Sequence, residues 1–246
     1  YCLHSVLLVP YYSWQRSHAI HHRFTNNISE GETHVPLVIE GNGITEQAGG
    51  EKDIAKYLRM GKNNYGMMQL ALHLLIGWPA YLLAGKTGGP IYGRTNHFWP
   101  TAPFSAKLWP SKWAKKVWLS DFGILITIVI LLIAIHTFSL LRVLGIYFAP
   151  LLVVNIWLVI YTWLHHTDSD VPHLAKSEFS YMRGAFLSID RPYGKILDFL
   201  HHNIGSTHVI HHIAPSIPHY YAKEATNAIK NAFPKAYLFN PMPIHK

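Results

Sequence analysis

The sequence predicts an all-α integral membrane protein with a cytosolic, histidine-rich cap domain, and three observations support this fold class. Half of the 246 residues are hydrophobic, whereas only 14% are charged. Soluble domains average about 25% charged residues, so this composition is typical of a membrane protein. Two apolar segments have the length of a membrane-spanning helix. The third observation is the content of 18 histidines, several of which form short clusters.

The apolar segments at 122–141 and 143–164 define a predicted membrane hairpin, at about 121–164. A spanning helix needs about 20 mostly apolar residues, and both segments meet this length. Only Arg142 separates them, so we expect the chain to turn there. A buried pair of core helices is the alternative, but 122–141 contains no charged residue, which disfavours it.

The flank that precedes this hairpin predicts its orientation. Residues 86–116 contain six lysines and arginines and no acidic residue. Under the positive-inside rule such a flank is cytosolic. The formal charge of +8 is therefore attributed to flanks of membrane segments, and nucleic acid is not expected as a partner.

The other segments are expected to form the cap, from residues 1–62 and 165–246. The polar, glycine-rich stretch at 28–62 is typical of a surface loop. Short helices are expected within 168–203, and an amphipathic helix at 219–232.

Two segments, SHAIHH at 17–22 and THVIHH at 207–212, contain the same pattern, His-x-x-His-His. Positions i, i+3 and i+4 lie on one face of a helix, so each segment is expected to direct three imidazoles the same way. Imidazole is the commonest metal ligand among protein side chains. The six candidate ligands are His18, His21, His22, His208, His211 and His212.

A third cluster, WLHHTDSD, lies where the second hairpin helix should reach the cytosolic face. His166 is a further candidate ligand, and His165 is the alternative to it. Capping of the helix C-terminus is the other interpretation of this pair. For Asp168 and Asp170, turn formation is favoured over metal binding.

The two motifs can serve one site only if they lie on the same side of the membrane. The chain must then cross an even number of times between 22 and 208. The hairpin supplies two crossings. A further apolar segment at 66–85, interrupted by Gly77 and Pro79, is therefore expected to be re-entrant or interfacial.

A site with many imidazoles and few carboxylates suits two chemistries at a membrane surface. One is hydrolysis at zinc, and the other is activation of O₂ by non-haem iron. A non-catalytic membrane metal-binding protein is the alternative. It predicts ligands along the spanning helices, where His136 and Asn155 are the only strong candidates.

The chain resembles the membrane-bound fatty-acid desaturases, and most closely the acyl-lipid delta-12 (omega-6, oleate) type. The resemblance covers nearly the whole chain, and both histidine motifs keep the family's spacing. It rests on LHSVLLVPYYSWQRSHAIHHRFTNN (3–27), ETHVP (32–36), WLHHTDSDVPH (163–173), SIDRPYG (188–194) and HHNIGSTHVIHHIAPSIPHYYAKEATNAIK (201–230).

The resemblance implies two iron ions held by His18, His21, His22, His166, His208, His211 and His212, with no other catalytic residue. Asp190, Asn203 and His165 are expected to orient these ligands. In the related acyl-CoA desaturases an Asn lies four residues before the ligand that corresponds to His166. Here that position is Thr162, which puts a water-mediated contact in doubt.

The implied reaction uses O₂ and two electrons to introduce a cis double bond into a lipid-linked acyl chain, with phospholipid-linked oleoyl as substrate and linoleoyl as product. Cytochrome b5 and its reductase, or ferredoxin, supply the electrons. The implied location is the endoplasmic reticulum membrane with the site facing the cytosol, or else a plastid or bacterial membrane. Hydroxylases, epoxygenases, acetylenases and omega-3 desaturases share the motifs and stay open as alternatives.

The family has a further histidine motif, His-x-x-x-His, shortly before the stretch that begins here at Leu3. The chain begins at Tyr1 and not at methionine. We therefore expect a partial chain that lacks two ligands, and a fragment of this kind is expected to be inactive alone.

Overall fold

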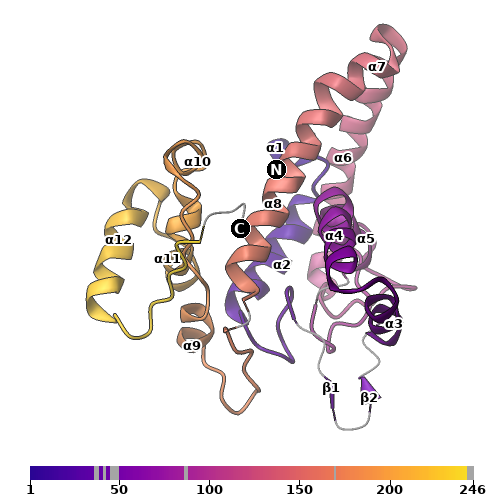
Figure 1. The fold of residues 1–246 in the computed structure, drawn as a ribbon. Helices are drawn as coiled ribbons and strands as arrows, with labels where there is room; N and C mark the ends of the chain where they lie inside the picture. The colour runs from indigo at the N-terminus through magenta and orange to yellow at the C-terminus, as the bar shows by residue number, and fades with distance from the viewer. Residues whose placement is uncertain (36–38, 41–42, 45–49, 86–87, 169, 243–246) are drawn as a thin grey trace. The chain divides into compact units, whose positions relative to one another are not determined.

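A computed structural model describes residues 1–35, 39–40, 43–44, 50–85, 88–168 and 170–242. These residues are mostly helical (Figure 1), which confirms the predicted all-α class. One pair of two-residue antiparallel strands, β1 (Ile39–Glu40) and β2 (Gly43–Ile44), accompanies the helices.

The chain divides into two compact units. The first comprises Tyr1–Ala19 and Pro36–Ile160, and the second comprises Ile20–Val35 and Tyr161–Lys246. Two helices, α2 (Tyr11–Arg23) and α8 (Ala149–His166), each contribute residues to both units.

The described residues of the first unit form a series of helices, labelled in Figure 1. They are α1 (Cys2–Val6), the first part of α2, α3 (Gly50–Met60), α4 (Lys62–Leu72), η1 (His73–Gly77), α5 (Trp78–Ala84), α6 (Ser111–Phe138), α7 (Leu140–Val143), η2 (Leu144–Phe148) and most of α8.

Among the described residues, three continuous helical stretches are long and apolar enough to cross a membrane. They are Lys62–Ala84, Lys112–Phe138 and Leu140–His166. Many of their apolar side chains are exposed, including Ile130, Ile133 and Ile146. Apolar surface of this extent marks a membrane or protein contact, which agrees with the predicted membrane helices.

The predicted hairpin turns three residues earlier than expected. Helix α6 ends at Phe138 and α7 begins at Leu140, with Ser139 between them at a φ of 94°. Arg142, the expected turn, lies inside α7. The apolar residues continue on both sides of Ser139. Hydropathy therefore placed the turn at Arg142, the one charged residue between the two apolar segments, and gave no sign of the backbone turn at Ser139.

The segment around Gly77 and Pro79 is not interrupted. Helices α4, η1 and α5 follow one another without a gap, and η1 is a π-helical turn just before the proline. A π-type turn changes the hydrogen-bond register, which accommodates a proline without ending the helix. That this helix is re-entrant or interfacial, and does not cross the membrane alone, stays a prediction.

The expectation of a loop throughout 28–62 was wrong, because α3 occupies Gly50–Met60. The glycine content obscured the helical spacing of Ile54, Tyr57 and Leu58. Residues 36–38, 41–42 and 45–49 of that stretch lie outside the described residues.

His97 ties the connection before α6 to two helices of the first unit. Its Nε2 lies 3.1 Å from the Ser17 hydroxyl, and its carbonyl accepts a hydrogen bond of 2.5 Å from the Ser13 hydroxyl. Its N–H donates to the carbonyl of Leu82 at 2.8 Å. These bonds join α2 to the end of α5. The side chain of His97 is fully buried.

The second unit begins with residues 20–35, which include the end of α2, and continues from the last turns of α8. Its described helices are α9 (Tyr181–Phe186), α10 (Lys195–Leu200), η3 (Ile204–Ser206), α11 (His208–Ile213) and α12 (His219–Ala232). Ile210, Ala222 and Ile229 form an apolar core between α11 and α12. The predicted amphipathic helix at 219–232 is confirmed.

Candidate metal centre

Helix α11 carries the second histidine motif, and the Asp190 carboxylate caps it. Oδ1 of Asp190 accepts a hydrogen bond of 2.8 Å from the N–H of Val209, and Oδ2 accepts one from the Tyr237 hydroxyl. A carboxylate at a helix N-terminus satisfies a free N–H group and interacts favourably with the helix dipole. Asp190 therefore fixes where α11 begins.

Helix α9 packs close to the residues that follow the first motif. A Cβ atom on Gly184 would lie 2.3 Å from the carbonyl oxygen of Thr25, so only glycine fits there. The Asn26 side chain donates to the carbonyl of Gly184 at 3.1 Å. This close approach brings residues 20–35 against the segment that ends in α11.

Four buried imidazoles converge in the second unit, from the end of α2, the end of α8, and α11. The Nε2 of His166 lies 3.1 Å from that of His21, 3.0 Å from that of His208 and 3.2 Å from that of His212. The Nε2 atoms of His208 and His212 are 3.1 Å apart. Three sequence-distant segments therefore supply nitrogens to one point.

Burial keeps two of these rings, those of His208 and His212, neutral. It lowers the pKa of His208 and of His212 well below the ordinary value, and the neighbouring imidazoles lower both further. Burial also lowers the pKa of His211. A neutral imidazole is the form that binds a metal.

The hydroxyl of Thr25 determines which nitrogen of His212 carries the proton. It donates to the carbonyl of His21 at 2.6 Å and lies 3.0 Å from Nδ1 of His212. Because the hydroxyl proton is already used, the Thr25 oxygen must accept from Nδ1–H. The Nε2 of a neutral His212 then presents a lone pair to the other rings.

A second threonine hydroxyl, that of Thr33, contacts Nδ1 of His21 as the Thr25 hydroxyl contacts Nδ1 of His212. Thr33 Oγ1 is 2.8 Å from Nδ1 of His21, whose Nε2 faces His166. Partners of this kind fix ring orientation in metal sites. Neither threonine was predicted from the sequence, although Thr25 lies four residues after His21, a spacing that places two residues on one face wherever a helix continues.

The donor set fits a metal cation. Nε2 atoms that all carry lone pairs repel one another at about 3 Å unless a proton or a cation lies between them. Ligands at right angles around a metal with bonds of about 2.1 Å also lie about 3 Å apart. The Nε2 of His166 lies 3.1 Å from that of His21 and 3.2 Å from that of His212, and ligand atoms of these three residues all lie within 4.8 Å of one another.

The remaining predicted ligands lie in two places. The rings of His22 and His211 are in edge contact at 4.5 Å between centroids, and His22 stacks on His212 at 4.3 Å. They therefore adjoin the four converging rings. His18 belongs to the first unit, where its ring stacks on Trp14 at 4.5 Å. Its role as a ligand stays a prediction.

The structure separates the two adjacent histidines that the sequence left as alternatives. Both ring nitrogens of His165 have partners, because Nδ1 donates to the carbonyl of Ile189 at 2.5 Å and Nε2 lies 3.1 Å from the Tyr193 hydroxyl. The ring of His165 stacks on His208 at 4.4 Å. It supports a neighbouring ring, whereas His166 points its Nε2 at the cluster.

Asn203 lies in the turn that precedes α11. It adopts a φ of 61°, and its carbonyl accepts hydrogen bonds from the hydroxyls of Thr207 and Ser206. These bonds shape the turn before α11. Its orienting role toward a ligand stays a prediction.

His34 is a histidine near the cluster that motif spacing did not reveal. Its ring lies parallel to that of His166 at 5.4 Å, and its carbonyl accepts from Nε2 of His173 at 3.0 Å. His34 lies outside any His-x-x-His-His pattern, so its position depends on the path of the chain after α2.

Long apolar helices and a buried cluster of imidazoles are compatible with a membrane protein that binds a metal. Comparison with known proteins identifies the family. The model of the fatty acid desaturase family matches residues 2–240. A delta(12) fatty acid desaturase of Mortierella alpina is 36% identical over 248 residues, covering 98% of this chain and 61% of that protein.

Two plant proteins have a similar sequence identity to this chain. A delta(12)-fatty-acid desaturase of Arabidopsis thaliana is 38% identical over 98% of this chain and 58% of its own length. The oleoyl-12-hydroxylase of Ricinus communis is 36% identical over 99% of this chain and 59% of its own length. The chain thus spans about three fifths of these relatives.

The chain belongs to the fatty acid desaturase family.

Proposed function

We propose that the chain is the histidine-rich part of an O₂-dependent acyl-lipid desaturase that introduces a cis double bond, at the delta-12 position of an oleoyl chain, to give linoleoyl. The observation that carries this proposal is the convergence of four imidazole Nε2 atoms from three segments. The delta-12 assignment rests on relatives that carry that name, at 36 to 38% identity.

Within this proposal, His21, His166, His208 and His212 hold iron, together with His18, His22 and His211. Two iron ions at such a site would supply the activation of O₂ and the removal of one hydrogen from each of two adjacent, unactivated methylenes. These two hydrogens, the two supplied electrons and two protons would reduce O₂ to two waters. Electrons would come from cytochrome b5 or ferredoxin.

The chain's own side chains orient the ligands and exclude water. Thr25 and Thr33 fix the ring orientations of His212 and His21 through Nδ1. The four rings are buried, and burial lowers the pKa of His208 and His212, which keeps these two rings in the neutral form that binds a cation. His165 packs its ring on His208 and does not bind the metal.

The proposed location is the endoplasmic reticulum membrane with the centre facing the cytosol. The basic residues at 86–116 support this orientation, and a relative from Glycine max is an endoplasmic reticulum isozyme. The acyl chain to be desaturated is proposed to be linked to a phospholipid.

Expression of the complete reading frame that contains this chain, in a yeast that makes no dienes, tests the function. Gas chromatography of total fatty acids should show linoleate. His212→Ala should abolish the product and the bound iron while leaving membrane insertion intact. His136→Ala is the matched control, because His136 is exposed on α6 and should keep full activity. Linoleate production by His212→Ala would refute the ligand role.

A hydroxylase is the second candidate, because the Ricinus communis oleoyl-12-hydroxylase is as similar as several desaturases. The same chromatograms distinguish the two. A 12-hydroxy acid in place of the diene would assign the chain to hydroxylation.

A further inference from the structure

Helix α10 exposes an apolar face in the second unit. Ile196, Phe199 and Leu200 occupy positions i, i+3 and i+4 and are 76%, 79% and 60% exposed. Tyr220 and Tyr221, in the first turn of α12, are also exposed. Apolar side chains gathered in this way on a polar domain mark a contact with a membrane or a partner.

The contacts of α10 indicate that its apolar face lies against a membrane and not against a protein partner. His201 follows directly after α10, and its Nδ1 is hydrogen-bonded to the Tyr161 hydroxyl, with ring centroids 5.2 Å apart. Tyr161 lies in the last turns of the apolar helix Leu140–His166. Tyrosines near the end of a spanning helix lie at the level of the lipid headgroups. Through His201, the end of α10 therefore lies at that level.

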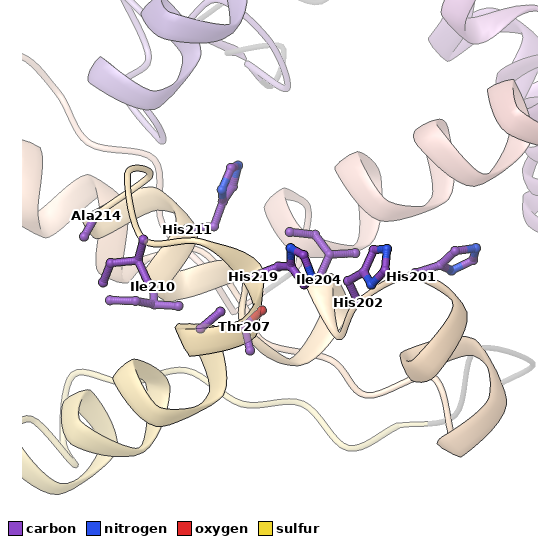
Figure 2. A pocket seen from close by; sticks show the side chains of 10 residues that line it. His201, His202, Ile204, Thr207, Ile210, His211, Ala214 and His219 are labelled. Carbon is purple, nitrogen blue, oxygen red and sulfur yellow. The ribbon is translucent and has the colours of Figure 1, made fainter. Parts of the chain in front are cut away.

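Two adjoining hollows open beside this face. The outer one, of about 410 Å³, is lined by Phe199, Leu200, Tyr220 and Lys223, among others. The inner one, of about 280 Å³, reaches His211 (Figure 2).

The two hollows share His202 and His219, whose rings lie beside each other with centroids 4.5 Å apart. No aspartate or glutamate is among the described residues that line either hollow. Asp198, on α10, instead accepts a hydrogen bond from the N–H of Tyr193. The outer hollow thus combines a cation and imidazole donors with an apolar border, which suits a phosphate diester attached to acyl chains.

We propose that α10 and the first turn of α12 form a lipid-contact surface, in which Ile196, Phe199 and Leu200 insert among acyl chains and the outer hollow binds a phospholipid phosphate through Lys223 and the His202–His219 pair. The membrane contact does not depend on which reaction the protein catalyses.

Site-directed fluorescence in lipid nanodiscs tests the surface. The complete protein, with its cysteines including Cys2 replaced by serine, receives a single cysteine in the variant Phe199→Cys and an environment-sensitive label. Lipids spin-labelled on the acyl chain should quench this label several-fold more strongly than one attached in Asn227→Cys. Asn227 is the matched control, exposed on the same face of α12 two turns beyond Tyr220. Ile196→Cys provides a second position if Phe199→Cys does not fold.

A headgroup-labelled lipid tests the hollow. It should quench a label in Tyr220→Cys, and Lys223→Gln should weaken that quenching, whereas Lys235→Gln should not. Equal quenching in both lysine variants would refute the phosphate site. A label at 199 that is quenched by aqueous iodide and not by lipid would refute the membrane contact. A label shielded from both would show that protein covers this face, which would also overturn the proposal.

Discussion

The hydroxyl of Thr25 lies between two histidines of different motifs, donating to the carbonyl of His21 and accepting from Nδ1 of His212. Thr25→Val keeps the shape and removes both bonds, so Nδ1 of His212 loses its partner and the ring is free to change tautomer. We expect iron affinity to fall about 10- to 100-fold. Thr25→Ser retains the hydroxyl and should keep near-normal affinity. Iron content measured after dialysis against graded chelator compares the two variants, and equal loss in both would contradict an orienting role.

His165 and His166 are adjacent in sequence but differ in what their rings contact. Both ring nitrogens of His165 are occupied by the Ile189 carbonyl and the Tyr193 hydroxyl, whereas Nε2 of His166 faces three other Nε2 atoms. We expect His166→Asn to lose bound iron and His165→Asn to retain most of it. Metal analysis of the purified, membrane-inserted proteins is the measurement. The reverse result would show that His165 is the ligand.

At the scale of elements, His97 joins α2 to α5 through its backbone and through the Ser17 contact of its side chain, which is buried and must stay neutral. Burial lowers the pKa of His97 from 6.5 to about 3. Below pH 6.5 the unfolded chain binds a proton that the folded chain excludes, so stability falls as the pH falls through this range. The loss is about 1.4 kcal/mol for each pH unit between these two values.

We therefore predict that the stability of the folded protein depends on pH through His97. His97→Gln, which keeps hydrogen-bonding capacity, should lower stability at pH 7.5 but reduce the further loss between pH 6.5 and pH 5 that the unsubstituted protein shows. Thermal unfolding in detergent across this range is the measurement. Parallel pH profiles for the two proteins would show that other groups control acid stability.

At the scale of the whole molecule, the topology depends on the helix Lys62–Ala84. His21 and His22 share a compact unit with His166, His208 and His212, so both motifs must reach the same side of the membrane. The hairpin is predicted to cross twice, so we expect this helix not to cross alone. Glycosylation acceptors introduced at 45–60 and at 95–110 should report the same face. Modification of one acceptor and not of the other would contradict this topology.

The amino-acid sequence by itself determined the helical class, two long apolar helices that follow one another, the amphipathic helix at 219–232 and the repeated histidine pattern. All of these depend on local periodicity, because a face of a helix is defined by spacing of three and four residues. The same reasoning placed the turn at Arg142 and not at Ser139, and it expected an interruption at Pro79 where the helix continues. A backbone turn and a π-helical adjustment leave no mark in hydropathy.

The tertiary structure decided which histidines converge and how their rings are held. Thr33 and His34 reach the cluster only because the chain after α2 turns back past His21 and His166. Likewise, His166 rather than its neighbour faces the other rings because the Ile189 carbonyl and Tyr193 engage His165. Spacing along one helix fixes the direction of a side chain, but the proton position on an imidazole depends on partners that only folding brings within hydrogen-bonding distance.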